Sequence, residues 1–163
     1  MSRKNFDEAL GLLSQNKDLL EPEDIVGELE ESVVSDAENE LDVVFPPMFR
    51  TYLLEYGQIT VGSEEIYGLM GGKYPGGAVP DLLWLTKALR SKGFPKYFLP
   101  IADLGDGRLF VIDLSRRNEE NESPVALVFP SAEIPSAAIE TVFDDFGDFL
   151  LDTVRRGLKG ILR

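Results

Sequence analysis

The spacing of the apolar residues changes at Gly57, and this change predicts a mixed α+β fold. Before it, Phe6, Ala9 and Leu13 recur at helical intervals, as do the aromatic and aliphatic residues between positions 47 and 56. After it come short β-prone runs separated by Gly and Pro, which is typical of strands. We therefore expect helices in the first third of the chain and a sheet in most of the rest.

Caps and breakers along the chain set the expected boundaries. Pro22 opens a short helical piece, Ser35 is an N-cap with Glu38 completing a capping box, and Gly57 caps the helix before it. The expected helices cover residues 5–16, a short piece from residue 22, 35–41, 47–56, 86–92 with Thr86 as N-cap, and 139–156. The expected strands cover residues 58–61, 65–69, 97–102, 108–114 and 125–129, with a glycine-rich loop at 71–77. The Asp106-Gly107 pair predicts a hairpin turn between two of these strands.

The composition excludes several kinds of site. The chain has 163 residues and contains no Cys and no His, so sites that need a thiol or an imidazole are absent. It carries 29 acidic against 16 basic residues, a net charge of −13, which disfavours direct binding of nucleic acid. The first residues lack the apolar run of a signal peptide, and no apolar stretch approaches the length of a membrane span, so we expect a cytoplasmic protein.

The negative charge is concentrated at the front of the chain. Residues 1–56 hold 14 acidic and 4 basic residues, whereas residues 57–163 hold 15 and 12. Between Asp18 and Asp42 there are eleven acidic residues and no Lys or Arg. Such a segment can be a docking surface that steers a basic partner, or it can be a solvated helix face.

Four ordered segments of the sequence carry a family resemblance. They are residues 38–57 (ENELDVVFPPMFRTYLLEYG), residues 66–69 (IYGL), residues 99–114 with LPIA, GDG and VIDL, and residues 123–128 (SPVALV) followed by FDDFGDFL at 143–150. In order and spacing they resemble the SUKH superfamily, the Smi/Knr-type proteins that act in bacteria as immunity proteins and in yeast as a cell-wall assembly regulator. The resemblance covers about residues 33–152. A single Gly57 stands where the family usually has two glycines.

The resemblance implies an α+β domain in which amino-terminal helices pack on a mostly antiparallel curved sheet and a C-terminal helix closes the fold. We expect one domain over residues 1–163, with residues 1–32 as an accessory helical segment. The implied function is that of a cytoplasmic immunity protein that binds and neutralises a cognate polymorphic toxin, often a nuclease in this superfamily. The alternative is a regulatory or scaffolding module with a different cellular partner.

The expected partner is therefore a basic toxin protein, bound by a monomer or weak dimer, with no enzymatic activity, cofactor, metal, nucleic acid or membrane involved. Acidic side chains would set the association rate, and an aromatic side chain would anchor the complex. The predicted partner-binding residues are Glu30, Glu31, Glu38, Glu40, Glu64, Glu65, Tyr67, Trp84, Asp103 and Asp106.

Two features of this set have alternative interpretations. Asp103 and Asp106 flank one hairpin together with Asp113, so a calcium site or a hydrolytic carboxylate pair must be weighed against ordinary turn hydrogen bonding. Turn hydrogen bonding is favoured, because the spacing does not fit an EF-hand. Tyr67 and Trp84 can form an aromatic contact surface with Tyr97, or they can pack in the core, which we expect at single positions.

Overall fold

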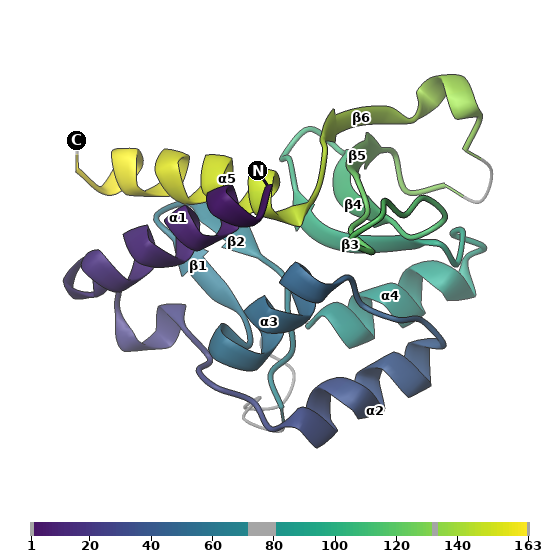
Figure 1. Cartoon of the computed structure of the whole chain (residues 1–163). Helices are drawn as coiled ribbons and strands as arrows, with labels where there is room; N and C mark the ends of the chain where they lie inside the picture. The colour runs from purple at the N-terminus through teal and green to yellow at the C-terminus, as the bar shows by residue number, and fades with distance from the viewer. Residues whose placement is uncertain (1, 72–80, 132–133, 163) are drawn as a thin grey trace.

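The chain folds into five α-helices and two antiparallel sheets over the residues described, which confirms the α+β class (Figure 1). The computed structural model describes residues 2–71, 81–131 and 134–162. The glycine-rich loop predicted at 71–77 therefore lies outside the described residues, apart from Gly71. The helices are α1 (Ser2–Gln15), α2 (Glu31–Leu41), α3 (Pro47–Tyr56), α4 (Leu82–Ser91) and α5 (Phe146–Ile161). None of the described helices is long and apolar enough to cross a membrane.

The strands form two sheets where one was expected. The first is the hairpin of β1 (Ile59–Val61) and β2 (Glu64–Ile66). The second contains β3 (Phe98–Asp103), β4 (Leu109–Asp113), β5 (Val125–Val128) and β6 (Glu140–Phe143), arranged in chain order. The Tyr67 N–H donates to the Ile101 carbonyl at 2.7 Å, so the end of β2 lies beside β3.

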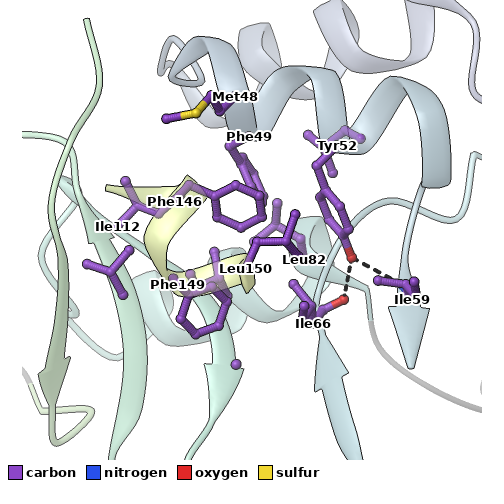
Figure 2. Close-up of a cluster of buried hydrophobic side chains, with 14 of the residues drawn as sticks. Met48, Phe49, Tyr52, Ile59, Ile66, Leu82, Ile112, Phe146, Phe149 and Leu150 are labelled. Atoms are coloured by element: carbon purple, nitrogen blue, oxygen red, sulfur yellow. Dashed lines mark hydrogen bonds between the residues drawn. The ribbon is translucent and has the colours of Figure 1, made fainter. Parts of the chain in front are cut away.

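The main core lies between α3, α5 and the sheets (Figure 2). Phe146 is fully buried, and its ring centroid lies 5.0 Å from that of Phe49 and 5.4 Å from that of Tyr52. The Tyr52 hydroxyl donates to the Ile66 carbonyl at 2.8 Å and accepts from the Ile59 N–H at 3.1 Å. This one side chain therefore ties α3 to both strands of the hairpin, and its burial raises the pKa of the phenol well above the usual value.

Helix α1 lies alongside α5 and adds to the same core (Figure 1). Phe6 is fully buried, with its ring centroid 6.3 Å from that of Phe146. The Asn5 amide donates to the Asp148 carboxylate at 2.8 Å, and Arg155 forms an ion pair with Glu8. The amphipathic pattern that predicted a first helix therefore reflects packing against the last helix of the chain.

The first turn of α3 is capped by a residue distant in sequence. Pro46 and Pro47 supply no N–H, so the Met48 N–H is the first donor of the helix that needs an acceptor. The Glu122 carboxylate accepts it at 3.0 Å. Glu122 is 5% exposed, and its second carboxylate oxygen is buried without a hydrogen-bond partner among the described residues. Burial is the main cause that raises the pKa of Glu122 to about 7, with a smaller contribution from the negative charge of Asp145.

The two predicted N-caps are wrong. Helix α2 begins at Glu31, so Ser35 lies inside it and accepts from the Arg50 guanidinium at 3.0 Å. Helix α4 begins at Leu82 and is capped by Asp81, whose carboxylate accepts from the Trp84 N–H at 2.9 Å. Thr86 is buried within that helix and its hydroxyl donates to the Leu82 carbonyl, the local bond that hydroxyl side chains make inside helices.

Two predicted helices begin differently in the structure, because part of each predicted segment is extended. The piece from Pro22 is a single 3-10 turn, Pro22–Asp24, after which the chain runs beside the end of α3. There the Gly27 N–H donates to the Tyr56 carbonyl at 2.8 Å. The closing helix begins at Phe146 with Asp145 as N-cap, because the residues before it pair with β5 as strand β6.

Candidate protein-binding surfaces

Four of the predicted partner-binding residues line one hollow of about 210 Å³, which we call the β2–β3 pocket. Glu64 and Glu65 come from β2, Tyr67 follows that strand, and Asp103 ends β3. The bond between Tyr67 and Ile101 sets these elements side by side. Asp103 is thereby brought beside Glu64, Glu65 and Tyr67, although it follows each of them by 36 or more positions in the chain.

The β2–β3 pocket combines carboxylates with aromatic rings. The side chains of Phe110 and Phe149 also line it, and both residues are buried. Tyr67 is half-buried, and burial followed by the charges of Asp103 and Glu65 raises the pKa of its phenol. Carboxylates beside the half-exposed ring of Tyr67 favour a cationic group, which gains charge-assisted hydrogen bonds and a cation–π contact on the face of that ring.

A cation of the same chain already occupies one side of the pocket. Arg156 of α5 forms ion pairs with Glu64 and, at 2.9 Å, with Asp152. No ion pair is found for Glu65 or Asp103 among the residues that the structure describes, although the Asp103 carboxylate accepts from the Gly105 N–H at 2.7 Å. The sequence interpretation did not place Arg156 at this site. The one local pattern that indicates an ion pair for it is its position four residues after Asp152 on a helix.

The turn carboxylates serve the hairpin. Asp106 lies outside the pocket, where it forms an ion pair with Arg108 at 2.9 Å, and the hydrogen bond from Arg108 lowers the pKa of its carboxyl. Asp113 accepts from the Ser115 N–H and hydroxyl. These bonds confirm the turn interpretation of the three carboxylates. Within residues 2–71, 81–131 and 134–162, no group of three His, Cys, Asp or Glu residues is arranged to hold a metal ion.

The other predicted residues, Glu30, Glu31, Glu38, Glu40 and Trp84, lie on α2, at its start, or on α4, a region we call the α2–α4 face. In Figure 1, α3 lies between α2 and β2, so the predicted residues of α2 are separate from those of the β2–β3 pocket. Trp84 is 60% exposed, which shows that the core interpretation is wrong for this residue. It is also wrong for Tyr97, which is 42% exposed.

Three of the four predicted acids of the α2–α4 face form ion pairs with cations of the same chain. Glu31 and Glu38 both form ion pairs with Arg50, and Glu40 forms one with Lys87 of α4. The Glu38 carboxylate also accepts from the Phe45 N–H at 2.7 Å, so this residue holds the loop after α2. The acidic run of the sequence is therefore partly an internal network, which a pattern of acids alone could not reveal.

Comparisons with known proteins show what this chain is similar to. The family model SUKH_6, described as SMI1-KNR4 cell-wall, matches residues 31–150. A search of the curated proteins finds no match. Eighteen chains of solved structures match. One of them, described as "Crystal structure of protein from Pseudomonas syringae pv. tomato", is 18% identical with a TM-score of 0.61, and the alignment covers 87% of this chain and 95% of that chain. At this identity the likeness shows a shared fold alone.

Proposed function

We propose that this chain, which belongs to the SUKH_6 family of SMI1-KNR4 cell-wall proteins, is an immunity protein that neutralises a cognate toxin by covering the toxin's active surface. It is a binding module rather than an enzyme, and it acts in the cytoplasm. The observation that supports one particular binding surface is the β2–β3 pocket, which Glu65, Tyr67 and Asp103 line together. A pocket of this chemistry suits a lysine or arginine side chain of a protein partner.

The charge of the chain supports a basic partner, and a nuclease toxin in particular. A nuclease holds phosphates with Lys and Arg side chains, so its active surface is positive. This chain has a net charge of −13, and a field of that sign raises the rate at which a basic protein arrives. The acids that remain without an ion pair in the described residues, such as Glu30 and Glu65, contribute to this attraction.

Trp84 supplies a second kind of contact. Its indole is 60% exposed at the start of α4, and tryptophans that become buried on binding are among the side chains that contribute most to affinity. We assign it the role of an anchor, which holds the complex once formed. The pocket and Trp84 then act on different steps, because charges change the association rate and an aromatic anchor changes the dissociation rate.

The test measures binding kinetics against the protein encoded beside this chain's gene in its native genome, at low and high salt. The double variant Glu65→Gln with Asp103→Asn should associate more slowly and lose part of its dependence on salt. The control Glu119→Gln removes an exposed carboxylate from the loop before β5 and should associate like the wild type. Association rates that are equal for all three proteins would contradict the assigned role of the pocket.

The anchor is tested in the same assay by Trp84→Ala. Its matched control is Phe129→Ala, which truncates an aromatic residue that is 57% exposed just after β5. Faster dissociation only for the Trp84 variant supports the proposal. If both variants dissociate like the wild type, the anchor lies elsewhere.

The description of the matching family model, which refers to the cell wall, favours the second candidate function. A regulatory or scaffolding module would use the same surfaces on a cellular partner that is not toxic. The two candidates differ in one cheap measurement, which is growth of a bacterial host expressing the neighbouring gene with and without this chain. Growth arrest that this chain relieves supports the immunity function, and a harmless neighbour supports the regulatory one.

A further inference from the structure

The loop between α2 and α3 exposes an apolar side chain on a fixed backbone. Val44 is 68% exposed, although valine is usually buried. Its carbonyl accepts from Arg117, and the next N–H, that of Phe45, donates to Glu38 at 2.7 Å. The loop starts at Asp42, whose φ of 55° is uncommon for a residue other than glycine. A strained, hydrogen-bonded loop therefore presents Val44 to the solvent in one position.

Two adjoining hollows of about 630 and 380 Å³ share this loop, and we call them together the Val44 groove. The smaller one is lined by the apolar side chains of Val43, Val44, Tyr97 and Leu114. Tyr97 is 42% exposed, and its ring packs edge-to-face on Phe98 with 4.6 Å between centroids, so it too has a fixed position. The groove thus offers both an exposed apolar ridge and an apolar hollow.

Opposite charges are balanced in the Val44 groove, in contrast to the acidic chain as a whole. Glu38 and Asp42 contribute two negative charges, and Lys96 and Arg117 contribute two positive ones. Two copies of a chain with a net charge of −13 repel each other, so they can approach most easily where the local charge cancels. Lys96 and Asp42 form an exposed ion pair, with 58% of the Lys96 side chain and 84% of the Asp42 side chain accessible to solvent. Across a two-fold axis, Lys96 of one copy can pair with Asp42 of the other in the same way.

We propose that the Val44 groove is an interface between two copies of this chain, in which Val44 of each copy enters the smaller hollow of the other. The proposal is independent of the toxin and of the β2–β3 pocket. An isologous contact of this kind needs the same surface to carry both the ridge and the hollow, and both signs of charge. The Val44 groove meets each of these requirements.

Sedimentation equilibrium of the full chain tests the proposal over protein concentrations from micromolar to millimolar. The wild type should form a dimer, and raising the salt concentration should strengthen it, because salt screens the repulsion between the two acidic copies. Val44→Asp should raise the dissociation constant by at least about tenfold, and Tyr97→Ala should raise it as well. The control Phe129→Asp adds the same charge at an exposed aromatic position outside the groove and should dimerise like the wild type.

Three results would overturn the proposal. The first is a wild-type chain that remains monomeric at millimolar concentration. The second is equal dimerisation of the wild type and of both groove variants, with circular dichroism showing that all are folded. The third is a monomeric wild type whose binding to the neighbouring gene product is lost in Val44→Asp, which would make the groove a partner surface instead.

Discussion

Replacing Glu122 with Gln should remove most of the pH dependence of stability between pH 5 and pH 7. Glutamine keeps an oxygen that can accept the Met48 N–H at the start of α3, but it cannot ionise. In the wild type, burial and the negative charges of Asp145 and Glu120 raise the pKa of Glu122 to about 7, against a usual value of 4.5. The ionised carboxylate is thus disfavoured in the folded protein and tolerated in the unfolded chain.

The sign of the effect follows from proton linkage. The folded state holds the proton of Glu122 up to about pH 7, whereas the unfolded state releases it above pH 4.5. Stability from this group is therefore complete below pH 4.5 and is lost as the pH rises to 7. At 1.36 kcal/mol for each unit between the two pKa values, the full loss is about 3 kcal/mol. Asp42 and Asp106 act in the opposite sense, since ionic hydrogen bonds lower the pKa of their carboxyls, so stability from them is lost at acidic pH.

Chemical denaturation at pH 4.5, 5.5, 6.5 and 7.5 measures this effect. The free energy of unfolding of the wild type should fall across the series, and that of Glu122→Gln should stay nearly constant over the same range. Glu119→Gln changes an exposed carboxylate of the same loop and should keep the wild-type slope. Parallel curves for the wild type and Glu122→Gln would refute the assignment of a raised pKa to this buried cap.

The remaining predictions concern packing and are measured by the free energy of unfolding. Phe146→Ala should cost about 3–5 kcal/mol, because it empties the centre of the aromatic core, and a cost below about 1 kcal/mol would contradict that position. Tyr52→Phe should cost about 1–3 kcal/mol by leaving two buried backbone groups without their partner. Gly157→Ala should destabilise, because the new Cβ would lie 2.3 Å from the Val61 carbonyl oxygen, while Gly160→Ala on the same helix meets open space and should stabilise by about 0.5–1 kcal/mol. Equal effects at the two glycines would refute the close approach of α5 to β1.

Local sequence patterns predicted the helices and strands whose ends are set by neighbouring residues in the chain. Helix α3 begins at Pro47 and ends before Gly57, as the proline and the glycine indicated, and the Gly57 N–H donates to the Leu53 carbonyl. Strands β4 and β5 fall within the predicted runs and β3 ends one residue beyond its run, because β-branched and aromatic residues there are bounded by turn residues. The family resemblance added the order of these pieces, which single patterns did not establish.

The errors arose where tertiary contacts decide the structure. The apolar residues between Ile139 and Phe146 recur at helical spacing, but Thr141 and Phe143 pair with β5 and extend the sheet instead. In the candidate site, no sequence pattern shows that Arg156 neutralises Glu64, since the two residues are 92 positions apart. The sequence did not predict the exposure of Val44 either, because two valines before a pair of prolines resemble core residues.

Titration of the neighbouring gene product with this chain tests the immunity function most directly. The toxic activity of that product is measured on its own substrate while the chain is added in increasing amounts. We predict that activity falls to zero near one chain per toxin, and that Glu65→Gln with Asp103→Asn requires more chain than the wild type does. Full activity in the presence of a large excess of folded wild-type chain would contradict the proposed function.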